Sequence, residues 1–78
     1  MTTKEFIKQC CLALDVEPGL LDRNSSPETV ETWDSLGYLS IIAMIDKEFG
    51  ITIGGDELEK FKTLGDIIDE LKTRGVLE

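Results

Sequence analysis

Apolar residues recur at the three-to-four-residue spacing of a helix in four stretches of this 78-residue chain. The first predicted helix covers residues 3–14. Thr2 and Glu5 have the spacing of a capping box at its start, and Pro18-Gly19 prevents its continuation. Its apolar face comprises Phe6, Ile7, Cys10 and Leu14.

A long connection, residues 15–33, separates this helix from the next and is rich in turn-forming residues. Most connections in compact domains have about 4–6 residues, and long ordered ones often carry functional surfaces. Without core contacts such a segment would not stay ordered. We therefore expect its apolar residues to attach it to the core, namely Leu20, Leu21, Val30 and Trp33.

The second predicted helix covers residues 35–49, with Asp34 as its N-cap and Gly50 at its end. An amphipathic helix needs only one apolar stripe, and this helix has two. The wider stripe comprises Tyr38, Ile41, Ile42, Ile45 and Phe49. The second stripe, roughly opposite, comprises Leu36, Leu39 and Ala43. One stripe is expected to face the core, and the other needs a separate explanation.

Two further helices are predicted, a short one at residues 56–61 and a longer one at residues 64–74 that ends before Gly75. The capping pairs are Asp56 with Glu59 and Thr63 with Asp66, and the apolar face of the longer helix comprises Leu64, Ile67, Ile68 and Leu71. The pattern therefore predicts an all-α fold. We expect a small four-helix bundle with a long first loop and a short third helix, as a single domain over residues 1–78.

Charge and composition exclude several classes of function and partner. Sixteen acidic against eight basic side chains give a net charge of −8, which disfavours nucleic acid and anionic membranes and suits partners with basic patches. Plain solubility is the alternative explanation of this charge. Without histidine the chain cannot form a Ser-His-Asp or Cys-His site. Adjacent Cys10 and Cys11 suit neither a disulfide nor a zinc site, so we expect reduced thiols and no metal. No run is long enough to span a membrane and the start lacks a signal-peptide pattern, which predicts a cytoplasmic protein.

Ser35 is the candidate for chemistry, because it is placed where a long loop meets the first turn of a helix. Backbone N–H groups there lack partners within the helix, and the helix dipole favours negative charge, so a phosphate on this serine would be stabilised. The alternative is that Asp34 and Ser35 merely start the helix.

The wider pattern resembles the acyl carrier protein family over essentially the whole chain. The resemblance rests on Trp33-Asp34-Ser35-Leu36-Gly37-Tyr38-Leu39, Phe49-Gly50-Ile51 and Phe61-Lys62-Thr63-Leu64-Gly65-Asp66. It implies that Ser35 bears 4′-phosphopantetheine, transferred from coenzyme A by a separate magnesium-dependent phosphopantetheinyl transferase, and that Asp34 helps to present the serine. The resemblance also implies that the protein carries acyl groups as thioesters and is not itself an enzyme.

The resemblance gives a function to both stripes of the second helix. The partner enzymes, namely the transferase and the acyl-loading or acyl-transfer enzymes, are expected to have basic or apolar docking patches. These patches would contact Leu36, Leu39 and Ala43. The carrier itself is expected to be a monomer. Burial under the long loop is the alternative. A space that shelters an acyl chain is implied along Tyr38, Ile42, Ile45, Phe49, Ile53, Leu58 and Phe61, although core packing alone also explains these residues.

The second helix departs from the family pattern in a way that bears on the metabolic pathway that the carrier serves. Carriers for general fatty-acid synthesis tend to have acidic residues on the exposed side of the second helix, where this chain has Gly37, Ser40 and Lys47. This predicts a specialised lipid, surface-polysaccharide or secondary-metabolite (polyketide-type) pathway. Two alternatives stay open, an aminoacyl carrier of the peptidyl or D-alanyl type and a helical adaptor without a prosthetic group.

Overall fold

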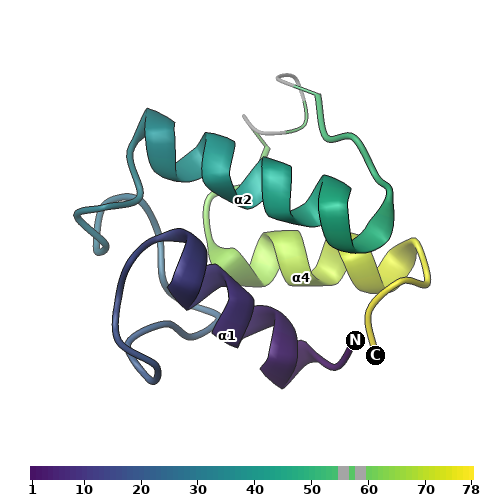
Figure 1. The fold of residues 1–78 in the computed structure, drawn as a ribbon, viewed down its shortest axis with the longest axis horizontal. Helices are drawn as coiled ribbons and strands as arrows, with labels where there is room; N and C mark the ends of the chain where they lie inside the picture. The colour runs from purple at the N-terminus through teal and green to yellow at the C-terminus, as the bar shows by residue number, and fades with distance from the viewer. Residues whose placement is uncertain (55–56, 58–59) are drawn as a thin grey trace.

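Three α-helices and no strands form the regular structure in the part of the chain that the computed structural model describes, residues 1–54, 57 and 60–78. They are α1 (Thr3–Ala13), α2 (Ser35–Phe49) and α4 (Leu64–Thr73). In Figure 1, α2 and α4 run across the molecule one above the other, with α1 below them. The all-α prediction is confirmed. Residues 56, 58 and 59 of the predicted helix at residues 56–61 lie outside the described residues, and so does its Asp56–Glu59 capping pair.

The start of α1 is fixed by the predicted capping box. The Glu5 amide donates to Thr2 Oγ1 at 3.1 Å, and the Thr2 amide donates back to Glu5 Oε1 at 3.3 Å. Hydrogen bonds from Thr2 lower the pKa of Glu5. The chain ends meet beside this helix, where the Glu78 amide donates to the Met1 carbonyl at 3.1 Å (Figure 1).

The start of α4 is also fixed by the predicted capping box, here between Thr63 and Asp66. Asp66 Oδ2 accepts from the amides of Lys62 at 2.8 Å and Thr63 at 3.1 Å, and these bonds lower the pKa of Asp66. The helix ends at Thr73, one residue earlier than predicted, because Arg74 is its C-cap and Gly75 adopts a left-handed φ of 77°.

The hydrophobic core is formed by all three helices and by residues of the long loop. Its members are Phe6, Cys10, Cys11, Leu14, Leu21, Trp33, Ile41, Ile45, Ile53, Phe61, Leu64, Ile67, Ile68, Leu71 and Leu77. Both cysteines are free thiols, and burial raises the pKa of Cys10 to about 12. A thiol that stays protonated and buried is a poor nucleophile, so Cys10 contributes packing.

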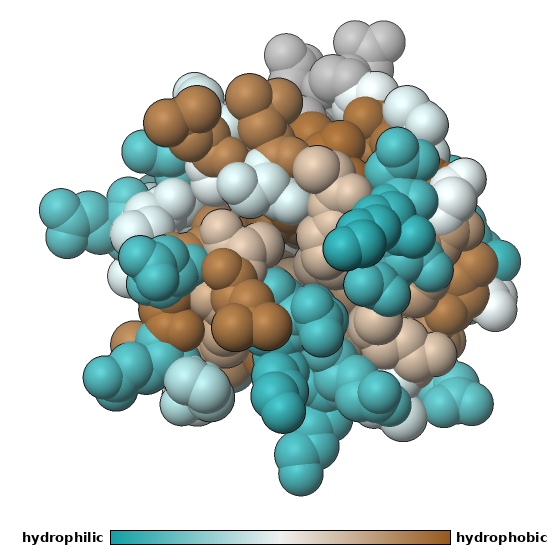
Figure 2. Space-filling model, viewed as in Figure 1, coloured by the Kyte–Doolittle hydropathy of each residue, from teal (hydrophilic) through white to brown (hydrophobic). Residues whose placement is uncertain are grey.

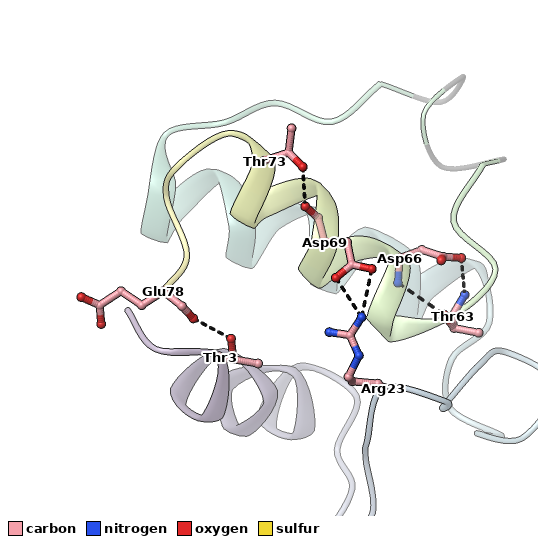
Figure 3. A network of polar contacts seen from close by, with 7 residues as sticks. All are labelled: Thr3, Arg23, Thr63, Asp66, Asp69, Thr73 and Glu78. Carbon is pink, nitrogen blue, oxygen red and sulfur yellow. Dashed lines mark hydrogen bonds and ion pairs between the residues drawn. The ribbon is translucent and has the colours of Figure 1, made fainter.

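The long loop is attached to α4 through its backbone. The Leu64 amide donates to the Ser25 carbonyl at 2.8 Å, and the Gly65 amide donates to the Arg23 carbonyl at 2.9 Å. The Arg23 guanidinium adds an ion pair with Asp69 at 2.8 Å (Figure 3). The first-turn amides of α4 are thereby satisfied, and the loop has a defined position beside the bundle.

Apolar anchors of the loop follow the prediction with one exception. Leu21 and Trp33 are buried, and Val30 is half-buried against the core. Leu20 is 63% exposed, so its predicted role as an anchor is wrong. The reason is local: Leu20 follows the left-handed Gly19, and the neighbouring Leu21 fills the core position instead.

None of the helices in residues 1–54, 57 and 60–78 combines the length and the apolar character that crossing a membrane requires.

Candidate functional site

Ser35 is the first residue of α2, and its side chain is exposed. Asp34 precedes it as the N-cap, with a side-chain oxygen that accepts from the Gly37 amide at 3.0 Å. The cap has extended backbone angles, φ −99° and ψ −160°, which turn the chain sharply from the loop into the helix. The serine hydroxyl therefore lies at the corner between the loop and α2, open to an incoming reagent.

The electrostatics of this corner suit a bound phosphate. The amides of Ser35 and Leu36 have no acceptor among the described residues, and the first turn of α2 contains no acidic side chain. A fifteen-residue helix carries a partial positive charge at this end. At the start of α4, by contrast, loop carbonyls already occupy the first amides. A phosphodiester on Ser35 Oγ therefore fits the first turn of α2.

Gly37 holds this first turn close to the loop. It is buried, and a Cβ added there would overlap the Thr32 carbonyl oxygen and lie 2.9 Å from Leu14 Cδ2. Our assignment of Gly37 to the exposed side of α2 is therefore wrong, because this position faces the loop and the end of α1. Ser40 and Lys47 are exposed, as expected.

The second stripe of α2 faces solvent. Leu36 is 73% exposed and Leu39 is 59% exposed, and Ala43 is also exposed. Burial of this stripe under the loop is therefore excluded. Hydrophobic side chains gather over the N-terminal half of α2 in Figure 2. We call Leu36, Leu39 and Ala43 the exposed leucine patch. It begins at the residue directly after Ser35.

The other side of α2 faces inward to different depths. Ile41 and Ile45 are buried, while Tyr38 and Phe49 are half-buried and pack against the core. Ile42 is half-buried and lies outside the hydrophobic cluster of the described residues. Of the remaining residues named for an acyl-chain space, Ile53 and Phe61 are buried, and Leu58 lies outside the described residues.

Tyr38 makes a contact that the helical pattern did not indicate. Its hydroxyl donates to the Phe61 carbonyl at 3.2 Å, and Trp33 packs edge-on against its ring at a centroid distance of 5.5 Å. Burial raises the pKa of Tyr38, so the hydroxyl stays protonated as a donor. The partners are 23 residues apart in the chain, and no local spacing carries that information.

A groove opens beside Tyr38 on the side of the long loop. Its lining comprises Ser26, Pro27, Glu28, Tyr38, Phe61, Lys62 and Thr63. The groove therefore joins three parts of the chain, the loop, α2 and the residues before α4. Sequence reasoning missed it because no one of these segments forms it alone.

The chain matches a known protein family. The family model described as "Phosphopantetheine attachment site" matches residues 10–71, well over half of the chain. The matched range begins within α1, contains the whole long loop and α2, and ends within α4.

Proposed function

The chain belongs to the phosphopantetheine-attachment family, and from this premise we propose that its prosthetic group is attached to Ser35 and that its cargo is an acyl group. Proteins of this family bear 4′-phosphopantetheine covalently and are carriers, not catalysts. When attached, this group supplies a terminal thiol that holds the cargo as a thioester. The observation that carries the proposal is the exposed Ser35 hydroxyl at the open first turn of α2.

The proposed attachment uses few groups of the carrier itself. Ser35 Oγ would form a bond to the phosphorus that bears pantetheine in coenzyme A, adenosine 3′,5′-bisphosphate would leave, and the serine proton would pass to the transferase. The chain contributes the exposed hydroxyl and the free amides of the first turn. Asp34 keeps this turn in place through its bond to the Gly37 amide and so presents the serine.

We further propose that the exposed leucine patch is the surface on which the transferase and the acyl-loading and acyl-transfer enzymes dock. Large aliphatic side chains with this exposure are unfavourable in water unless a partner covers them. The patch is next to Ser35, so an enzyme that covers it also reaches the hydroxyl. Asp46 and Glu48, which are exposed, add acidic contacts for basic groups of a partner.

Replacing Leu36 and Leu39 together by alanine should lower kcat/KM for phosphopantetheinyl transfer by about tenfold or more, since each buried leucine contributes about 1 kcal/mol or more at an interface. The free energy of unfolding should change by less than about 0.5 kcal/mol, because both side chains are exposed. Leu12→Ala is the matched control, as Leu12 is 67% exposed but lies on α1. An equal loss in the control would contradict docking through this patch.

The pathway is proposed to be specialised and not general fatty-acid synthesis. Ser40 and Lys47 are exposed on α2 where general carriers tend to have carboxylates, so enzymes that dock through arginine pairs find fewer partners. Reconstitution with standard fatty-acid synthase enzymes tests this directly. If elongation proceeds as well as with a general carrier, the specialised assignment is wrong.

The nature of the cargo has a separate test. Intact-mass analysis of the protein purified from its natural source, before and after thioester cleavage, reports the group and its mass together. An acyl group supports the proposal, whereas an aminoacyl group would assign the chain to the peptidyl or D-alanyl type. An adaptor without a prosthetic group does not fit the family to which the chain belongs.

A further inference from the structure

We propose that Tyr38 closes the space between α2 and Phe61 to the cargo, so that this carrier holds a short or polar acyl group outside the helix bundle. The inference rests on the proposed attachment at Ser35. It concerns a property that family membership leaves open, namely whether the cargo is sheltered in the core or presented in solvent.

The position of Tyr38 makes it the first inward residue that a cargo would meet. Residues three apart on a helix are neighbours on its surface, so Tyr38 lies one turn after Ser35 on the same side of α2. The half-buried ring separates the exposed serine from the buried Ile41 and Ile45 farther along the helix. An acyl chain that entered between α2 and Phe61 from this end would have to displace the tyrosine.

The ring is held from two directions. Its hydroxyl donates to the Phe61 carbonyl at 3.2 Å, and the ring itself lies 5.5 Å from the Trp33 ring in an edge-on arrangement. Trp33 is 1% exposed. Its indole N–H has no acceptor among the described residues, so packing and not a hydrogen bond holds this ring in place. Moving Tyr38 would break both contacts and leave the carbonyl of buried Phe61 without this donor.

The described residues behind Tyr38 belong to one buried cluster of the hydrophobic core. Ile41, Ile45, Ile53 and Phe61 have exposed fractions of 1%, 0%, 5% and 8%, respectively. Protein interiors are packed about as densely as organic crystals, so adding methylene groups forces side chains from preferred rotamers. A long acyl chain would therefore have to replace contacts that the core makes with itself.

Outside Tyr38, the groove of the site is open and mixed in character. Four of its seven lining residues are polar or charged, namely Ser26, Glu28, Lys62 and Thr63. A short group with hydroxyl, amino or carboxyl substituents would keep water or these side chains as hydrogen-bond partners. The polar side chains of the groove thus give a short polar cargo hydrogen-bond partners beside the apolar surfaces of Pro27, Tyr38 and Phe61.

Thermal unfolding of loaded protein tests the proposal. The unmodified protein is loaded from acetyl-, octanoyl- or palmitoyl-coenzyme A with a broad-specificity transferase, and loading is verified by intact mass. A buried chain would raise Tm by about 3–6 °C per buried methylene group in a domain of this size. We expect the octanoyl and palmitoyl forms to unfold within about 2 °C of the acetyl form, since that shift is smaller than burial of one methylene group would give. Stabilisation that grows with chain length would overturn the proposal.

Replacing Tyr38 tests whether this residue is what keeps the acyl chain out of the core. In Tyr38→Ala, the octanoyl form should unfold at a higher temperature than the acetyl form of the same variant, because the vacated space admits the chain. Tyr38→Leu serves the same comparison if the alanine variant does not fold. Leu12→Ala, which truncates a 67% exposed leucine on α1, is the matched control and should show no length dependence. A Tyr38 variant without length dependence would overturn the role of Tyr38.

A second readout locates the chain directly. The methyl NMR signals of Ile41 and Ile45 should be the same in the acetyl and octanoyl forms of the wild-type protein and should differ between those forms in Tyr38→Ala. A wild-type difference at these methyls would place the chain in the core and contradict the proposal. Failure of the loading step itself would count against attachment at Ser35, so the two proposals fail in distinguishable ways.

Discussion

Ser35→Ala should acquire no phosphopantetheine from coenzyme A and a broad-specificity transferase, whereas the wild-type protein should gain the mass of one group. The alanine variant lacks the oxygen that would bond to phosphorus, and no residual rate is expected. Because Ser35 is exposed on the first turn of α2, the free energy of unfolding should change by less than about 0.5 kcal/mol. Intact mass and chemical denaturation measure the two effects on the same samples.

Ser40→Ala is the matched control for this result. Ser40 is also exposed on α2, but it lies more than one turn beyond the free amides of the first turn. This variant should be modified at the wild-type rate. Residual modification of Ser35→Ala, or a peptide map that places the group on another serine, would show that the attachment site is assigned incorrectly.

Gly37→Ala should lower the free energy of unfolding by about 2 kcal/mol. A methyl group at this position overlaps the Thr32 carbonyl oxygen and comes within 2.9 Å of Leu14 Cδ2. Overpacking typically costs about 1–3 kcal/mol, and we expect a value near the upper end because the overlapped atom belongs to the backbone. The better helix propensity of alanine offsets about 1 kcal/mol of this cost. Urea denaturation with an unchanged m-value measures the loss.

The same substitution should slow the modification of Ser35. Relief of the overlap requires the first turn of α2 to move away from the loop, and that movement displaces the serine from the corner between the loop and α2. Gly54→Ala is the control, because nothing lies within 4 Å of a Cβ added there. It should leave stability unchanged or raise it by up to about 1 kcal/mol. If Gly37→Ala were as stable as this control, the loop would not constrain the first turn as described.

The helix boundaries could be predicted from the sequence because short-range interactions set them. Thr2 with Glu5 and Thr63 with Asp66 form reciprocal caps in the structure at the predicted positions. Gly50 ends α2 with a left-handed φ of 68°. Each of these interactions joins residues within four positions of each other, so the order of residues along the chain contains all the information needed.

The residue pattern was enough to predict the three described helices with their ends to within one residue, the family resemblance and the candidacy of Ser35. Which apolar residues are exposed depends instead on what the long loop covers, and this is known only from the packing of the folded chain. Leu21 is buried and Leu20 is not, and Gly37 faces the loop while Leu36 and Leu39 face solvent. The contact between Tyr38 and Phe61 is likewise decided by packing between segments distant in the chain, which helical periodicity does not encode.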